Sequence, residues 1–532
     1  MDRPGRWILL IVFVTAISFA PALSFFFLSD DFTLIETARN SSVQALFSSE
    51  TWVYYRPLLL LSYAVEHALW KASPAGYHAT NVLLHVFNTV LVCFLARRLP
   101  GRSGRSWIFA GLLFGLTPIH ASSILWICGR TDLLCGTFYL ICIWTFLLHM
   151  EEGRPVLRWV SIFSFIVALL CKEMAGSIPL VCLIWGAIFF RKEGNFQHSF
   201  AKALKASWVY FLGLALYFVF RYFLFGHFPK SPVHDAPPLG YLFTNIGRYG
   251  AGLIFPFDLE AVKPFFRPRP DLLLVGSLVG IGVFLVLLRF VVARRPLVFA
   301  GTWTGITLLP VLKFAGPWYL YIPSAGVALG LGDLLAAFVS GGKAERVRRW
   351  IIVAMIIGIH LFGLAQAEYN TRIASNMSRQ VLSELIQYVP AAKKAILINA
   401  PSQYRGVPVF GWKGNVSSGL QLLGHPRELQ ILTSVRYAVP KDPMHIVLSR
   451  AEKRVMISLE GGHNFFQSDA EMIASWIRSR PGDVYQTPEG VVEVLSLNAM
   501  GRPSSLAIRP TWLEDASIPI LAYSECQIKS IE

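Results

Sequence analysis

The rest of the chain is organised around one stretch, which begins Leu28-Ser29-Asp30-Asp31-Phe32. It follows the apolar run 7–28 and opens a polar loop. The loop continues through Tyr54-Tyr55-Arg56-Pro57-Leu58 to Gly76-Tyr77-His78-Ala79-Thr80-Asn81, where the next apolar run begins. Ionisable groups are costly at a membrane boundary. Two adjacent carboxylates that share this level with an arginine and a histidine therefore indicate function.

The composition predicts a membrane protein. Of 532 residues, 54% are hydrophobic and only 15% are charged, and the mean hydropathy is +0.51. Soluble domains carry roughly 25% charged residues. The net charge of +16 would suggest a nucleic-acid partner in a soluble protein. Here the basic residues lie in short loops, as membrane orientation requires, so we expect membrane lipids and no nucleic acid as partners.

The apolar runs predict an all-α membrane bundle of about eleven spans. Arg3 and Arg6 precede the first run, and no small-residue cleavage site follows it, so we expect an uncleaved first helix. The expected spans are 7–28, 79–96, 107–119, 133–149, 159–175, 177–190, 207–225, 272–291, 297–314, 319–340 and 350–368.

Basic residues predict the orientation of the bundle. Clusters at 97–105, 154–158, 191–205, 289–295 and 343–349 fall at alternate ends of successive spans, which places them in the cytoplasm. The N-terminus is then cytoplasmic, and the loops 25–77 and 226–270 lie on the opposite side. Residues 241–257 are expected to form an interfacial or re-entrant helix that faces the active site.

The sequence predicts two domains. Residues 1–369 form the transmembrane domain, with the first outer loop at 28–78. Residues 370–532 form a small extracytoplasmic α/β domain, with strands near 395–400, 444–449 and 491–497 and a helix at 471–478. The seven cysteines show neither a disulfide framework nor metal-ligand spacing. Asn40, Asn376 and Asn415 each begin an Asn-x-Ser sequence in an outer segment.

Several outer-end residues suit sugar transfer from a phosphate-linked donor. A carboxylate must take the acceptor's proton, and Asp30 or Asp31 could do so; either could instead cap a helix at 32–39. Cations must hold the leaving phosphate, and Arg56, Arg130 and Lys172 are the candidates. The alternatives are that Arg56 only snorkels to the interface, that Arg130 pairs with Asp132, and that Lys172 is neutralised by Glu173.

Three outer loops with paired charge favour convergence on one pocket. The other residues expected in that pocket are His78, Asn81, His120, Asp132, Glu173 and Arg248. His85 lies two turns deeper than His78 and is expected to be a hydrogen-bonded core histidine. The sequence specifies no cofactor, and it leaves open whether the protein needs a divalent metal ion.

These motifs resemble the membrane part of C-type (GT-C) glycosyltransferases. The similarity is carried by Tyr55-Arg56-Pro57-Leu58, Gly76-Tyr77-His78-Ala79-Thr80-Asn81, Thr117-Pro118-Ile119-His120, Gly129-Arg130-Thr131-Asp132, Lys172-Glu173 and Tyr319-Leu320-Tyr321-Ile322-Pro323. Over roughly residues 20–340 the chain looks like the protein O-mannosyltransferase-like proteins with tetratricopeptide repeats and their bacterial homologues. The repeats are absent here, and Pro317-Trp318 replaces the charged pair expected before Tyr319.

The resemblance implies a polyprenyl-phosphate sugar donor, a mannose-like hexose, and catalysis outside the cytoplasm. It also implies a carboxylate base in the first outer loop, with Asp30 favoured over Asp31. The expected protein is an inverting glycosyltransferase, and the acceptor could be a protein Ser or Thr hydroxyl, a glycan or a lipid. A transporter or flippase of lipid-linked sugar and an inactive assembly factor are the alternatives. The expected location is a bacterial inner membrane with the C-terminal domain in the periplasm, or the endoplasmic reticulum membrane.

Overall fold

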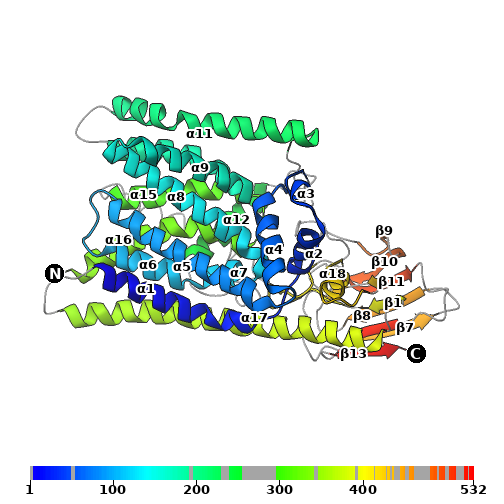
Figure 1. Cartoon of the computed structure of the whole chain (residues 1–532). Helices are drawn as coiled ribbons and strands as arrows, with labels where there is room; N and C mark the ends of the chain where they lie inside the picture. The colour runs from blue at the N-terminus through cyan, green and yellow to red at the C-terminus, as the bar shows by residue number, and fades with distance from the viewer. Residues whose placement is uncertain are drawn as a thin grey trace.

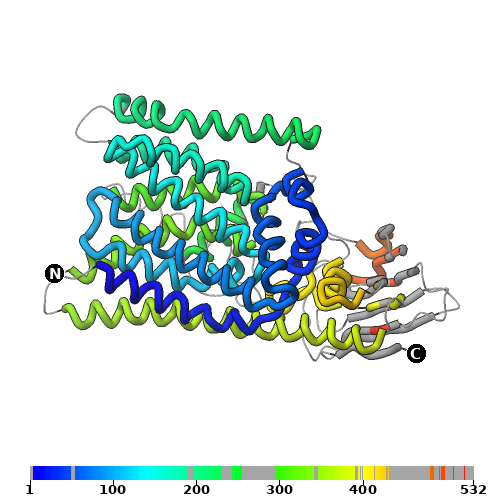
Figure 2. Tube along the Cα trace, in the orientation of Figure 1, coloured from blue at the N-terminus to red at the C-terminus, as the bar shows by residue number. Residues whose placement is uncertain are grey.

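The structure is a computed structural model of the 532-residue chain. Residues drawn in colour in Figure 2 are among those that it describes. The described residues are 4–48, 54–190, 196–228, 239–254, 295–314, 316–340, 345–389, 394–398, 400–411, 414–426, 428–431, 434–435, 444–449, 454–459, 480–487, 490–497, 503–510, 520–524 and 527–531.

A helical bundle makes up most of the described chain (Figure 1). Proline stands in the first turn of α5, α9 and several short helices, where its missing N–H costs nothing. The helices of the bundle are α1 (Pro4–Phe19), η1 (Ala20–Ser24), α5 (Pro74–Arg98), α6 (Ser106–Leu116), η2 (Pro118–His120), α7 (Ala121–Ile124), η3 (Ile127–Gly129), α8 (Arg130–Glu152), α9 (Pro155–Cys171), η4 (Glu173–Ser177), α10 (Ile178–Phe190), α11 (Phe196–Phe225), α15 (Arg295–Leu308), η5 (Leu309–Val311), η6 (Pro317–Leu320), α16 (Tyr321–Val339) and α17 (Arg346–Tyr388).

Six helices in the described part are long and apolar enough to cross a membrane, or seven if the bent pair of α6 with η2 and α7 counts as one span. Shorter apolar helices cover the expected spans 159–175 and 177–190, and α15 covers most of 297–314 in only 14 residues. The expected span 272–291 lies outside the described residues. A mostly helical membrane bundle is therefore present, whereas the count of eleven spans is not confirmed.

The first outer loop folds into three helices that cover one end of the bundle. These are α2 (Asp30–Asn40), α3 (Val43–Ser48) and α4 (Pro57–Trp70), and Figure 1 shows them between the bundle and the strands. The helix expected at 32–39 is thus confirmed as α2. The helix expected at 241–257 is α12 (Leu239–Ile254), which packs beside η6.

The chain after α17 is rich in strands. One sheet has the order β13-β12-β1-β5 and is parallel except for the β12–β13 pair, and a second sheet has the antiparallel order β7-β8-β11-β10-β9. The helix expected at 471–478 lies outside the described residues. The elements are β1 (Lys394–Ile398), β2 (Ala400–Pro401), β3 (Gln403–Tyr404), β4 (Val407–Pro408), α18 (Gly414–Leu422), β5 (Glu428–Ile431), β6 (Ser434–Val435), β7 (Met444–Ser449), β8 (Arg454–Leu459), β9 (Val484–Thr487), β10 (Gly490–Leu497), β11 (Pro503–Pro510), β12 (Ile520–Ser524) and β13 (Gln527–Ile531).

Two large hydrophobic cores hold these parts together. The first lies inside the helical bundle and includes Trp185, Trp303 and Tyr321. The second joins Phe32 of α2 and Tyr63 of α4 to α17, α18 and the first sheet of the C-terminal part. One continuous hydrophobic core therefore connects the first outer loop to the C-terminal part, and the two pack directly against each other.

Candidate active site

The first turn of α2 places two carboxyl groups in different surroundings. Ser29 precedes the helix with φ +48°, a region that residues other than glycine rarely adopt. The side chain of Asp31 is fully buried, whereas Asp30 is half-buried. The two neighbours in sequence are therefore not equivalent candidates for the catalytic base.

Both oxygens of Asp31 are occupied by backbone amides. The Leu28 N–H donates to Oδ2 at 2.9 Å, and the Cys128 N–H donates to Oδ1 at 2.7 Å. The Trp126 indole also donates to the Leu28 carbonyl at 3.0 Å. Asp31 thus ties the turn before α8 to the start of α2, which is a structural role.

Asp30 keeps one oxygen available. Ser29 Oγ and Asn415 Nδ2 both donate to Asp30 Oδ1, at 3.3 and 3.1 Å, and no partner of Oδ2 lies in the described part of the chain. Burial raises the pKa of Asp30, and the bonds from Asn415 and Ser29 and the nearby Arg56 guanidinium partly oppose that rise. A carboxylate with a free oxygen and a raised pKa suits a general base.

Arg56 stands just before α4 and pairs with Glu173. Its Nη2 lies 2.8 Å from Glu173 Oε2, and its guanidinium lies 4.1 Å from the centre of the Tyr54 ring. Burial lowers the pKa of Arg56, but the Glu173 carboxylate outweighs burial and raises that pKa above its ordinary value. The buried Arg56 Nε and Glu173 Oε1 have no hydrogen-bond partner among the described residues.

A second buried pair lies beside the first. Lys172 follows the end of α9, and its Nζ lies 2.6 Å from Asp132 Oδ1 in the first turn of α8. The ammonium group is also 4.8 Å from the centre of the Tyr319 ring. Asp132 Oδ2 has no partner among the described residues. Lys172 and Glu173 are adjacent, so the two ion pairs form one group.

We call Asp30, Arg56, Asp132, Lys172 and Glu173 the outer cluster. Its five charged residues come from four segments of the chain, and three of its buried polar atoms lack partners in the described chain. Buried polar groups without partners are rare in proteins and need an explanation such as a ligand. The alternative that Lys172 and Glu173 neutralise each other is wrong, because each pairs with a different residue.

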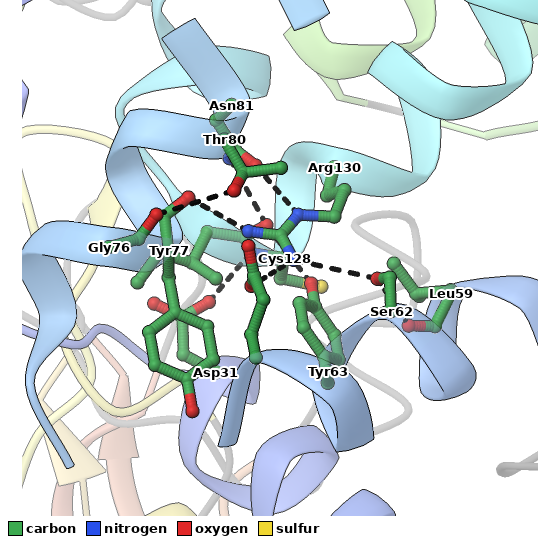
Figure 3. A network of polar contacts seen from close by, with 12 residues as sticks. Asp31, Leu59, Ser62, Tyr63, Gly76, Tyr77, Thr80, Asn81, Cys128 and Arg130 are labelled. Atoms are coloured by element: carbon green, nitrogen blue, oxygen red, sulfur yellow. Dashed lines mark hydrogen bonds and ion pairs between the residues drawn. The ribbon is translucent and has the colours of Figure 1, made fainter. Parts of the chain in front are cut away.

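Arg130 lies in a separate network (Figure 3). Its Nε donates to Asn81 Oδ1 at 2.9 Å, its Nη2 donates to the Tyr77 carbonyl at 2.8 Å, and its Nη1 pairs with Glu66. All three guanidinium nitrogens are thus occupied by protein groups, and the side chain is fully buried. The alternative of an Arg130–Asp132 pair is wrong, because Arg130 pairs with Glu66 and Asp132 with Lys172. Because its nitrogens are occupied, we do not include Arg130 among the proposed phosphate ligands.

Asn81 belongs to the Arg130 network and has no contact with the outer cluster. Its Nδ2 donates to the Ile124, Trp126 and Ile127 carbonyls at 3.2–3.4 Å. This amide holds the turn before α8 while its oxygen accepts from Arg130. We assign Asn81 to the support of that turn.

The three other expected pocket residues also lie apart from the outer cluster. His120 Nε2 lies 2.7 Å from Ser324 Oγ deep in the bundle, and Arg248 contacts Asn245 of its own helix at 3.4 Å. His78 is buried edge-on to Phe25. His85 bonds Tyr321 and the Gly115 carbonyl, which confirms it as a core histidine.

Sequence analysis missed two groups beside the cluster. Tyr54 and Tyr319 place their rings against Arg56 and Lys172. Tyr319 stands in a motif that resembles the glycosyltransferase family, and Tyr54 directly precedes another, so proximity to these motifs was the available signal. Among the described residues, no group of three or more His, Cys, Asp or Glu side chains is arranged to hold a metal ion.

Long apolar helices with an ionisable cluster at one end define a multi-pass membrane protein. The chain is 37% identical over 132 residues to the protein O-mannosyl-transferase Tmtc1 of Drosophila melanogaster, which covers 24% of this chain and 15% of that protein. It is 31% identical over 183 residues to tmtc2 of Xenopus laevis, which covers 31% of this chain and 22% of that protein. It is 38% identical over 144 residues to human TMTC2, which covers 26% of this chain and 17% of that protein. The chain therefore spans only 15–22% of the length of these relatives.

No family model matches the chain. Among solved structures, ArnT from Cupriavidus metallidurans in the apo state is 13% identical with a TM-score of 0.43, over 97% of this chain and 100% of that chain. The mycobacterial arabinofuranosyltransferase AftD is 12% identical with a TM-score of 0.43, and the match covers 82% of this chain and 32% of that chain. These structural likenesses are too weak to carry an argument.

Proposed function

We propose that this chain is a membrane glycosyltransferase that moves a hexose, mannose first among candidates, from a polyprenyl phosphate to an acceptor hydroxyl. The observation that carries the proposal is the outer cluster. In it, Asp30 keeps one carboxylate oxygen without a partner among the described residues and lies near Arg56, and Arg56 and Lys172 form two adjacent ion pairs. The similar proteins named as O-mannosyl-transferases support the choice of sugar. A protein Ser or Thr hydroxyl is the first acceptor to test.

The proposed reaction is a single displacement. Asp30 accepts the proton of the acceptor hydroxyl while the hydroxyl oxygen bonds to the anomeric carbon of the sugar. The bond between that carbon and the phosphate oxygen breaks, and the polyprenyl phosphate leaves with the electron pair. Because attack comes from the face opposite the phosphate, the product has inverted configuration, and no second carboxylate acts as nucleophile.

The rest of the outer cluster binds the donor in this proposal. Arg56 Nε and the remaining Lys172 protons point to a role in holding the phosphate as its negative charge grows. Asp132 Oδ2 and Glu173 Oε1 can accept hydrogen bonds from sugar hydroxyls. The carboxylates also keep both cations in place before the donor arrives.

The test is a transfer assay with purified protein, synthetic polyprenyl-phosphate mannose and a Ser/Thr-rich peptide. The proposal predicts mannosyl peptide whose anomeric configuration, read by NMR, is opposite to that of the donor. Retention of configuration would refute the single displacement. Movement of intact lipid-linked sugar across vesicles without transfer would favour a flippase, and neither activity would favour an assembly factor.

The proposed site faces the extracytoplasmic side, either the periplasm or the endoplasmic reticulum lumen. Cysteines introduced by Gly104→Cys and Asn376→Cys suit a labelling test, because both positions are exposed. Gly104 lies in the loop between α5 and α6, and Asn376 lies in the C-terminal half of α17. A membrane-impermeant reagent applied from outside should modify only the cysteine at position 376. Equal modification of both from that side would contradict this orientation.

A further inference from the structure

The C-terminal part of the chain lies directly on the first turn of α2. The Ser29 N–H donates to the Val409 carbonyl at 2.7 Å, and the rings of Phe32 and Phe410 stack with centres 5.9 Å apart. Gly411 approaches so closely that a Cβ there would overlap Ser29 Oγ. The uncommon backbone conformation of Ser29 is thus held by a segment roughly 380 residues later in sequence.

Asn415, the second residue of α18, reaches Asp30 from this segment. Its Nδ2 donates to Asp30 Oδ1 at 3.1 Å and to the Phe410 carbonyl at 2.6 Å. Its Oδ1 accepts from Thr33 Oγ1. Because a carboxylate and a carbonyl can only accept, the amide nitrogen must face them, which leaves one orientation for the Asn415 amide.

We propose that Asn415 is a positioning residue for the Asp30 carboxylate, so that the C-terminal part of the chain completes the active site. The amide occupies Asp30 Oδ1 and leaves Oδ2 for the acceptor proton. The inference rests on the proposed function for its catalytic meaning. The placement of Asp30 by Asn415 can nevertheless be measured without turnover.

The bond from Asn415 also favours the ionised form of Asp30. A donor to a carboxylate lowers its pKa, and among the hydrogen bonds and charges that act against burial, the Asn415 bond has the largest effect on the pKa of Asp30. The other titratable groups that face Asp30 are Asp31, Arg56, Tyr54 and Cys128. Loss of the amide should therefore raise the pKa of Asp30 while these groups stay in place.

Burial of Asn415 bears on one of the three Asn-x-Ser sequences. Asn415-Val416-Ser417 is an Asn-x-Ser sequence, but the Asn415 side chain is 1% exposed and its Nδ2 is hydrogen-bonded. Asn40 and Asn376, by contrast, are exposed. In the folded protein Asn415 therefore cannot accept a glycan, and its polar amide serves the contact with Asp30.

The experiment measures the protonation of Asp30 in the purified full-length protein. Carbodiimide modifies protonated carboxyl groups, and mass spectrometry of the Asp30 peptide gives the labelling midpoint against pH. Asn415→Leu keeps the side-chain volume but removes the donor, and it should raise that midpoint by roughly one pH unit. The acid limb of the transfer rate should move up by the same amount.

Ser418→Ala is the matched control, because Ser418 lies one turn along α18 and contacts Thr33 without touching Asp30. Its labelling midpoint and transfer rate should equal those of the wild type. Thr33→Val is a milder second variant that removes the bond orienting the Asn415 amide, and it should shift the midpoint in the same direction. It keeps the test decisive if Asn415→Leu does not fold.

Unchanged midpoints in folded Asn415→Leu or in Thr33→Val would overturn the positioning role. A shifted midpoint in a protein that transfers no sugar would instead refute the proposed function and leave the Asn415–Asp30 contact intact. The two failures are therefore distinguishable.

Discussion

The Arg130 network and the outer cluster both gather ionisable groups at the same end of the bundle, but they differ in how completely their arginine side chains are paired. Every guanidinium nitrogen of Arg130 has a protein acceptor. In the outer cluster, Arg56 Nε, Asp132 Oδ2 and Glu173 Oε1 lack partners in the described chain. Glu66 Oε1 of the Arg130 network also lacks a partner among the described residues, so the difference lies in the arginines. A fully paired guanidinium stabilises the fold, whereas an unpaired N–H is available to a substrate.

Asp30 and Asp31 repeat this contrast at the scale of two residues. Two backbone amides occupy Asp31, while one oxygen of Asp30 has no partner in the part of the chain that the structure describes. Adjacent identical side chains thus have different surroundings, because the first turn of a helix directs them to different sides. Variants in the two regions should consequently separate effects on stability from effects on catalysis.

The largest change in stability should come from the Arg130 network. Arg130→Met leaves the buried Glu66 carboxylate unpaired, and breaking such a pair costs about 3–5 kcal/mol. Thermal unfolding in detergent measures this loss. Arg154→Met removes an exposed pair with Glu152, for which about 0–1 kcal/mol is expected, and serves as the matched control. Equal losses of stability in the two variants would contradict the structural role of the Arg130 network.

Substitution of Arg56 should reduce turnover strongly and stability only slightly, the reverse of what we expect for Arg130. Arg56→Gln removes the cation that we propose holds the leaving phosphate, and loss of one such stabilising group typically costs about 10²–10³-fold in turnover. The Arg56–Glu173 pair is partly exposed, so the unfolding free energy should change by only about 1 kcal/mol. A variant that unfolds readily but transfers sugar at the wild-type rate would place Arg56 with the structural group.

Asp31 should affect stability to a smaller extent than Arg130. Asp31→Asn replaces one acceptor oxygen by a donor, which leaves either the Leu28 or the Cys128 amide without its partner. An unsatisfied buried amide costs about 1–3 kcal/mol. Thermal unfolding should reveal that cost, and hydrogen exchange should increase at whichever amide is released. Unchanged exchange at both amides would contradict the structural role.

The smallest expected effect is a displaced pH profile. Asp30 must be ionised to accept a proton, so the transfer rate falls as pH decreases through its pKa. Burial raises that pKa above its ordinary value, and the acid limb should therefore lie at higher pH than for an exposed aspartate. A rate profile across pH 4–8 checks this (roughly one unit is readily resolved). A limb at the ordinary aspartate pKa would contradict the burial argument.

Sequence patterns were sufficient for the coarse architecture. Apolar runs located most of the long helices, and the strand at 444–449 coincides with β7. The runs that became α9, α10 and α15 are apolar but short. Hydropathy therefore could not separate spans from shorter buried helices, because both bury apolar side chains.

Pairing within the site could not be predicted in the same way. Lys172 and Glu173 are adjacent in sequence, but they lie where α9 ends at Cys171 and η4 begins. Lys172 pairs with Asp132 and Glu173 with Arg56. Asn415 reaches Asp30 across 385 residues. No local pattern encodes such a contact, which depends on how α17 returns the chain to the first outer loop.

The most direct test of the central claim compares Asp30→Asn with Asp31→Asn in single-turnover transfer from polyprenyl-phosphate mannose. Asp30→Asn keeps the shape of the side chain but removes the base, so we expect the rate to fall on the order of 10²–10⁴-fold with donor binding and thermal stability retained. Asp31→Asn should retain most of its rate at temperatures where it is folded. Wild-type turnover by folded Asp30→Asn would contradict the account and place the base elsewhere.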